Sequence, residues 1–117
     1  MLFRKRARQV PVSLERERER EREQELSVVQ ADSIDHLLAD WDVTFIKMDV
    51  EGSELRALHG AEHTIISKRP RLAICVYHKP EDLITIPQYI RSLLPEARFY
   101  LRSHTYGIVD KVLYVIP

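Results

Sequence analysis

The chain has 117 residues with 18 basic and 18 acidic side chains, so its formal net charge is zero. A chain of this length forms at most one small domain, and its zero net charge gives no electrostatic argument for nucleic-acid binding. A single cysteine excludes an internal disulfide, and no apolar run approaches the roughly 20 residues that span a bilayer, so we predict no membrane span and a cytoplasmic location.

Residues 1–25 form a charged, low-complexity segment. Glutamate and arginine alternate almost perfectly from Leu14 to Glu25, which on a helix places opposite charges at i,i+3 but like charges at i,i+4. The segment offers no apolar face to bury, so it is either a solvated helix or a disordered chain, and we assign it no chemical role. We place the globular domain after it, at residues 26–117.

Four apolar residues near the start of this domain recur with helical spacing. They stand at i, i+3, i+4 and i+7, which predicts a short amphipathic helix capped by Asp32 or Ser33. The four residues are Ile34, Leu37, Leu38 and Trp41. A buried strand is expected next, from Val43, because β-branched and aromatic residues precede a turn at Gly52 and Ser53.

Two carboxylates follow this predicted strand directly. Asp49 and Glu51 stand where the strand stops and the next helix begins, and Glu54 in the first helical turn suits the helix dipole. In open α/β sheets, ligands bind in the crevice at the carboxyl ends of the strands. The sequence therefore predicts a functional site around Asp49 and Glu51.

The remaining elements alternate between helices and strands. We expect a helix at 54–68, a nearly continuous apolar strand at 71–77, a helix with Pro87 at its first position, and two final strands, 97–103 and 111–116, as a hairpin. Cys75 lies within the apolar strand, where a buried structural role is favoured over that of a nucleophile. The order predicts an α/β fold with a mostly parallel sheet and a late antiparallel strand.

His78 follows the second apolar strand as Asp49 follows the first. Asp49, Glu51 and His78 together would form a cluster able to orient a hydroxyl acceptor, act as a general base or hold a hard metal ion. The run from His59 to His63 also fits His-x-x-Glu-His, a zinc-peptidase pattern. Gly60 weakens the helix that this pattern requires, and no distal glutamate ligand stands out. We therefore predict no metal site there and assign no metal to the chain.

The residues from Phe45 to Glu54, Phe-Ile-Lys-Met-Asp-Val-Glu-Gly-Ser-Glu, followed by Leu58-His59-Gly60-Ala61, resemble the signature of the FkbM-type methyltransferase family. The resemblance continues through Tyr-His-Lys-Pro-Glu-Asp-Leu at 77–83 and extends from about Val28 to Pro117. It implies a Rossmann-like α/β domain that uses S-adenosylmethionine, with a small-molecule or sugar hydroxyl as methyl acceptor. It also implies that Asp49, Glu51 and His78 are catalytic.

The chain departs from the family pattern before Asp32, where the family's donor-binding half, with its glycine-rich turn, has no counterpart. The three glycines form no Gly-x-Gly loop, so cofactor-binding residues stay unassigned and the chain resembles the carboxyl-terminal portion of such a domain. Two functions remain open: an O-methyltransferase, or a non-catalytic remnant or protein-interaction module. The strand ending at Asp49 would then be an exposed apolar edge, which predicts self-association.

Overall fold

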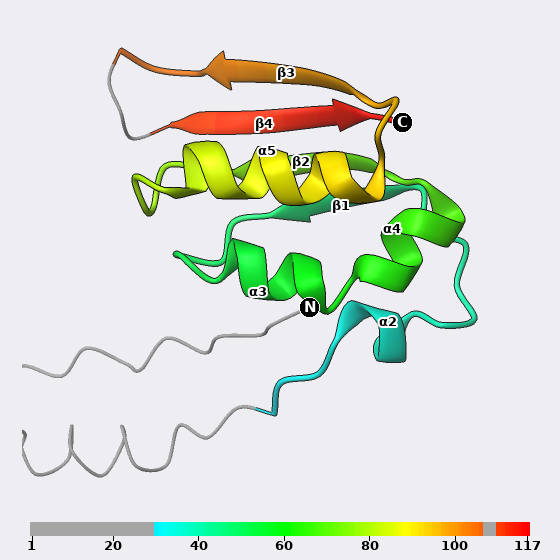
Figure 1. Ribbon diagram of the computed structural model, residues 1–117. Coiled ribbons are helices and arrows are strands. Elements are labelled where there is room, and N and C mark those ends of the chain that lie inside the picture. The colour runs from blue at the N-terminus through cyan, green and yellow to red at the C-terminus, as the bar shows by residue number, and fades with distance from the viewer. Residues whose placement is uncertain (1–29, 107–109) are drawn as a thin grey trace, which may run out of the picture. The chain divides into compact units, whose positions relative to one another are not determined.

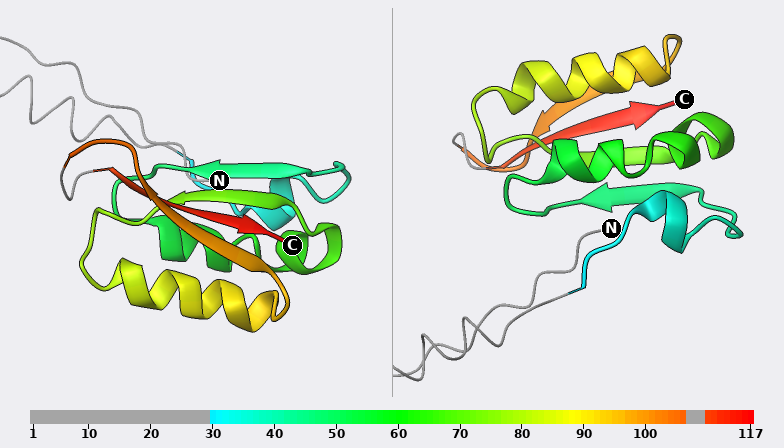
Figure 2. Two further views of the ribbon diagram at one scale, coloured as in Figure 1. Left: turned by 90° about the horizontal axis from the view of Figure 1, so that it is seen from above. Right: turned by 60° about the horizontal axis from the view of Figure 1, so that its bottom comes forward.

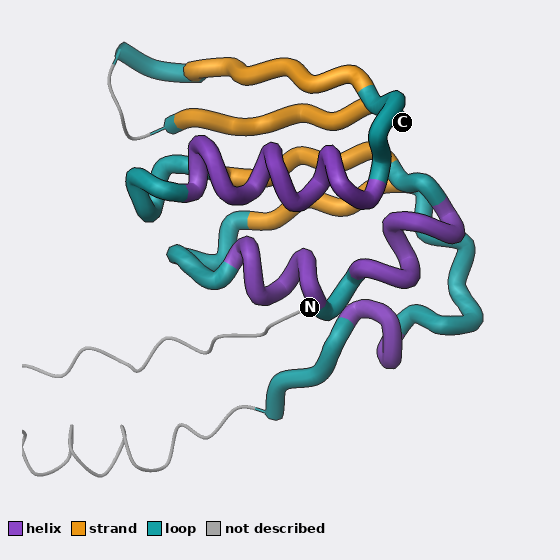
Figure 3. Tube along the Cα trace, viewed as in Figure 1, coloured by secondary structure: helices purple, strands orange, loops and turns teal. Residues whose placement is uncertain are grey.

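The computed structural model describes residues 30–106 and 110–117 (Figure 1). The prediction for the glutamate and arginine tract lies outside these residues. Helices and strands alternate along the described part of the chain (Figure 3). Its helices are α2 (Ile34–Leu37), α3 (Glu54–His59), α4 (Glu62–Lys68) and α5 (Asp82–Leu93), and its strands are β1 (Phe45–Met48), β2 (Arg71–Cys75), β3 (Arg98–Ser103) and β4 (Lys111–Ile116). None of these helices is long and apolar enough to cross a membrane.

The four strands form one sheet in the order β1-β2-β4-β3. β1 and β2 pair in parallel, with Phe45 opposite Arg71, whereas β4 is antiparallel to both β2 and β3. Three strands therefore run in one direction and β4 runs against them. This arrangement confirms the predicted α/β fold with a mostly parallel sheet, a late antiparallel strand and a hairpin formed by β3 and β4.

Helices α3, α4 and α5 lie on one face of the sheet (Figure 2). Alternate strand residues point toward them, and the most deeply buried are Leu72, Ile74 and Val115. Fully burying an aliphatic side chain of this size contributes about 1.5–3 kcal/mol. The opposite face carries a smaller buried cluster of Ala73, Cys75 and Val112 with Tyr77 and Tyr114 packed against it. No helix of the described residues covers this second face, which we call the open face (Figure 2).

α2 is a single turn, so the prediction of a helix reaching Trp41 is wrong. Ser33 is the N-cap, and its hydroxyl accepts a hydrogen bond from the backbone N–H of His36 at 3.1 Å. Of the four apolar residues, only Ile34 is buried, and Trp41 is 67% exposed. The backbone carbonyls beyond the turn instead bind the ammonium group of Lys68, which contacts those of Leu38, Ala39 and Trp41. Tertiary contacts therefore replace further helical hydrogen bonds.

The predicted helix at 54–68 is two helices, α3 and α4, separated at Gly60. The Asp35 carboxylate accepts hydrogen bonds from the backbone N–H groups of His63 at 3.0 Å and Thr64 at 2.8 Å, and from the Thr64 hydroxyl at 2.7 Å. Backbone N–H groups are free for such bonds only in the first turn of a helix. Because glycine also weakens a helix interior, the carboxylate of Asp35 and the flexibility of Gly60 together favour a new helix start.

α5 begins at Asp82, so the prediction that Pro87 occupies its first position is wrong. The Glu81 carbonyl accepts hydrogen bonds from the N–H groups of Ile84 at 2.9 Å and Thr85 at 2.8 Å, which builds the first turn ahead of the proline. Pro87 then lies within the helix, where it cannot donate a backbone hydrogen bond. Ile86 and Ile90 are buried on the side of α5 that faces the sheet, and their burial offsets that loss.

Candidate functional site

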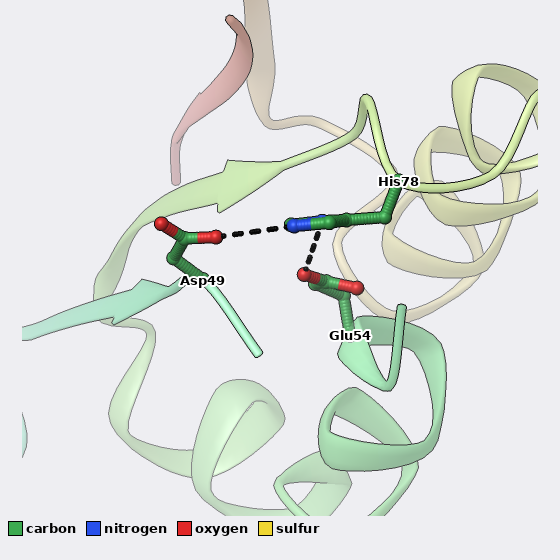
Figure 4. Close-up of side chains that lie close together, drawn as sticks. All are labelled: Asp49, Glu54 and His78. Atoms are coloured by element: carbon green, nitrogen blue, oxygen red, sulfur yellow. Dashed lines mark ion pairs between the residues drawn. The ribbon is translucent and has the colours of Figure 1, made fainter. Parts of the chain in front are cut away.

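Two neighbouring parallel strands deliver polar side chains to the same edge of the sheet. Asp49 follows β1 directly, and His78 lies just beyond the end of β2. Glu54 is the first residue of α3. Figure 4 shows the His78 ring between the Asp49 and Glu54 carboxylates. The predicted convergence of strand ends is therefore present, and we call Asp49, Glu54 and His78 the strand-end cluster.

The His78 ring has a carboxylate beside each nitrogen. Its Nε2 atom lies 3.4 Å from Oδ1 of Asp49, and its Nδ1 atom lies 2.9 Å from Oε1 of Glu54. The second separation is short, but it lacks hydrogen-bond geometry, and Nδ1 is buried without a hydrogen-bond partner. The side chain of Asp49 is 51% exposed, that of His78 16% and that of Glu54 0%. The cluster therefore runs from solvent at Asp49 to a buried carboxylate at Glu54.

Glu54 is held by the turn that precedes it. Its carboxylate accepts a hydrogen bond from the Val50 N–H at 3.0 Å and another from the Gly52 N–H at 2.9 Å. The turn needs left-handed backbone at Glu51, with φ 53°, and at Gly52, with φ 98°. Ser53 occupies the N-cap position of α3, but its side chain makes no cap hydrogen bond. The Glu54 carboxylate, rather than the serine hydroxyl, therefore satisfies the backbone donors of the turn.

The sequence interpretation missed Glu54 as a site residue and named Glu51 in its place. The structure brings Asp49 and His78 together, whereas Glu51 lies in the connecting turn, outside the group of ligand atoms within 4.8 Å of one another. The sequence did contain a signal for Glu54: it is a carboxylate two residues after the turn glycine Gly52, at the start of a helix with a buried face. The catalytic assignment of Asp49, Glu51 and His78 stays a prediction.

Tyr77 and Asp82 border the strand-end cluster. The Tyr77 hydroxyl donates to Oδ1 of Asp49 at 3.3 Å, and its ring lies against that of His78 with centroids 4.1 Å apart. Burial, followed by the nearby Asp49 carboxylate, raises the pKa of Tyr77. Asp82 is only 3% exposed and its Oδ2 atom has no hydrogen-bond partner. Burial and the negative charge of Glu54 raise the pKa of Asp82, although Lys79 acts in the opposite direction.

The remaining candidates have structural contacts of their own. His59 ends α3 and His63 lies in α4, so the zinc-peptidase pattern is divided between two helices. The His59 ring contacts the Tyr89 ring at a centroid distance of 4.1 Å, and the Tyr89 hydroxyl donates to Glu62 at 2.8 Å. Cys75 is buried in β2, as predicted, and burial followed by the charge of Asp49 raises its pKa to about 11.

The comparisons with known proteins match this chain to FkbM methyltransferases. The family model of the methyltransferase FkbM domain matches residues 4–108. The crystal structure of methyltransferase FkbM from Methylobacillus flagellatus KT is similar, with 46% sequence identity and a TM-score of 0.66 over 70% of this chain. The match spans only 22% of the length of that protein. No curated protein matches the chain.

Proposed function

Because this chain belongs to the FkbM methyltransferase family, we propose that it takes part in methyl transfer from S-adenosylmethionine to a hydroxyl oxygen of a small molecule or sugar. One observation supports this function above the others: two strands and a helix N-terminus bring Asp49, Glu54 and His78 to the carboxyl edge of the sheet. Ligands of open α/β domains bind at this edge. The choice of a hydroxyl acceptor rests on the family resemblance and on the basic groups of this cluster.

The proposed reaction needs groups that orient the acceptor and take its proton. The hydroxyl oxygen forms a bond to the methyl carbon and loses its proton, while the bond from sulfur to methyl breaks and leaves its electron pair on sulfur. S-adenosylhomocysteine and the methyl ether are the products. His78 and Asp49 are suited to accept the proton or a hydrogen bond from the hydroxyl, because Asp49 faces solvent and His78 lies beside it.

Glu54 acts through His78 in this proposal. Its carboxylate is fixed by two backbone N–H groups and lies beside Nδ1 of the imidazole. A buried negative charge in that position favours a ring orientation with Nε2 directed toward Asp49 and the solvent. Glu51, in the adjoining turn, is proposed to contact the acceptor from the exposed side. Glu54 is therefore a positioning residue, whereas Asp49 and His78 would contact the acceptor.

Isothermal titration calorimetry of the 117-residue chain with S-adenosylmethionine tests whether the donor binds. Transfer of radiolabelled methyl to a panel of monosaccharides then tests the reaction. We expect saturable donor binding and methyl transfer that is lost in His78→Ala and reduced in Asp49→Asn. Asp40→Asn, which makes the same change at an exposed aspartate outside the strand-end cluster, should retain activity. Absence of saturable heat at millimolar donor would exclude this chain as an enzyme on its own.

A non-catalytic interaction module is the second candidate, and the exposure of the sheet favours it. β1 and β3 are the two edge strands of the sheet, and no described strand pairs with the outer side of β1. Phe45 on that strand is 55% exposed and lies on the open face. An exposed apolar edge strand pairs readily with another strand, so we propose a second copy of this chain as its partner. Donor binding separates the two candidates, because the interaction module has no need of S-adenosylmethionine.

A further inference from the structure

Negative charge is concentrated around His78. Three carboxylates, those of Asp49, Glu54 and Asp82, lie near a single imidazole ring. Within residues 30–106 and 110–117, no lysine or arginine forms an ion pair with any of the three. Burying a carboxylate without a compensating positive charge or hydrogen bond is costly. Two backbone N–H groups compensate Glu54, and Asp49 is half exposed and accepts a hydrogen bond from Tyr77, so Asp82 is the carboxylate left with an unpaired oxygen.

Asp82 is not part of the strand-end cluster, and it provides separate support for uncompensated negative charge in this region. It comes from α5 and is 3% exposed, yet its Oδ2 atom has no hydrogen-bond partner. Native structures rarely leave a buried carboxylate oxygen without a partner unless an ion, a water molecule or a functional role accounts for it. Its charge acts on the same buried region as the charge of Glu54. Lys79 offsets part of this charge, but no lysine or arginine of the described residues forms an ion pair with Asp82.

The strand-end cluster has the composition and spacing of a cation site. Each of its three residues offers one ligand atom, and these atoms lie within 4.8 Å of one another. Two ligand atoms bound to one ion at about 2.1 Å are themselves separated by about 3 Å at a right angle. The 2.9 Å separation between His78 Nδ1 and Glu54 Oε1, which is not a hydrogen bond, is therefore the separation expected of two ligands that share an ion.

We propose that Asp49, Glu54 and His78 bind one divalent metal ion. Two carboxylate oxygens and one imidazole nitrogen favour a first-row divalent ion such as Mn²⁺, and three protein ligands leave coordination positions open. If the proposed function is correct, an acceptor hydroxyl occupies one open position, where the ion favours loss of its proton to solvent, and Asp49 and His78 then act as ligands of the ion rather than as the base. The acceptor role rests on the proposed function, whereas the binding of the ion does not.

Electron paramagnetic resonance during titration of the 117-residue chain with Mn²⁺ tests the site. We expect one tightly bound ion per chain, with nitrogen coupling in pulsed spectra from the His78 imidazole. Asp49→Asn should weaken binding by at least about tenfold, since loss of even an outer partner of a metal ligand costs about that much. His78→Ala should remove the nitrogen coupling. Asp40→Asn is the matched control and should bind Mn²⁺ as the unmodified chain does.

The glutamates at residues 14–25 also offer carboxylates to Mn²⁺. The variants are therefore needed to show which residues bind the ion. Equal Mn²⁺ affinity in Asp49→Asn and the unmodified chain would place the ion elsewhere and overturn the proposal. Absence of nitrogen coupling would overturn it as well. The result is distinct from the test of methyl transfer: Mn²⁺ binding without donor binding would contradict the proposed function alone, and donor binding without Mn²⁺ binding would contradict the metal site alone.

Discussion

The Nδ1 atom of His78 lies 2.9 Å from Oε1 of Glu54, a carboxylate that is completely buried. The two residues come from different parts of the fold, since Glu54 begins α3 and His78 follows β2. Their contact ties the turn after β1 to the loop after β2. A substitution at either residue therefore changes both the local fold and the electrostatics of the strand-end cluster.

We expect Glu54→Ala to destabilise the protein by about 2 to 4 kcal/mol, because the N–H groups of Val50 and Gly52 would lose their acceptor. Glu54→Gln should cost less, since its amide oxygen can still accept one of these bonds. Urea unfolding followed by circular dichroism measures both. Glu96→Ala, at an exposed position, should change stability by no more than about 0.5 kcal/mol. Equal effects of Glu54→Ala and Glu96→Ala would show that the turn does not depend on this carboxylate.

Burial raises the pKa of Asp35, but the hydrogen bonds from Thr64 and His63 together outweigh burial, so the pKa is lowered. A lowered folded-state pKa contributes stability that is complete above the unfolded pKa of about 3.9 and is lost as pH falls through the folded-state value. Asp35→Ala should therefore cost about 1 kcal/mol at neutral pH, as for a lost helix cap. We expect this difference in the free energy of unfolding to shrink below about pH 4.

Unfolding measured across pH 2.5 to 7 tests the role of Asp35, with Asp40→Ala as the control. Asp40 is exposed and lies outside the first turn of α4, which begins at Glu62. A stability difference for Asp35→Ala that stays constant from neutral to acidic pH would show that its ionised carboxylate does not support α4. The same measurement on Thr64→Val should show a smaller loss, because the backbone N–H bonds to Asp35 remain.

Sedimentation velocity should show concentration-dependent association of the unmodified chain through the β1 edge. Phe45→Glu places a charge on this edge strand, where Phe45 is 55% exposed, and should shift the distribution toward monomer. Ile66→Glu makes a comparable change on α4, where Ile66 is 48% exposed, and should leave association unchanged. A stable monomer of the unmodified chain at all concentrations would count against pairing through β1.

Cys75 should react slowly with thiol reagents in the folded protein. Its pKa is raised to about 11, first by burial and then by the charge of Asp49. At pH 8 the thiolate fraction should therefore be about two orders of magnitude below that of a free cysteine with pKa about 8.5. Ellman's reagent should modify the thiol rapidly only in denaturant. Equally fast modification of folded and unfolded protein would contradict burial of Cys75.

Local sequence patterns were sufficient to predict the four strands of the described sheet. Runs of apolar residues mark β1, β2 and β4, and their pairing follows from the need to bury the same apolar side chains. The position of Asp49 and His78 at adjacent strand ends followed from the parallel arrangement. The helices were less predictable, because Asp35 and Lys68 bind backbone groups far along the chain and decide where α4 begins and α2 ends.

The sequence by itself therefore determined the family, the strand pattern and two residues of the strand-end cluster, because each depends on residues close together in the chain or on a recognisable signature. Only the tertiary structure decided that Glu54 completes the cluster. Its burial requires left-handed backbone at Glu51 and Gly52, which turns the carboxylate back beneath Val50 and toward His78. That contact joins two segments separated by a helix pair and a strand, and no local pattern encodes it.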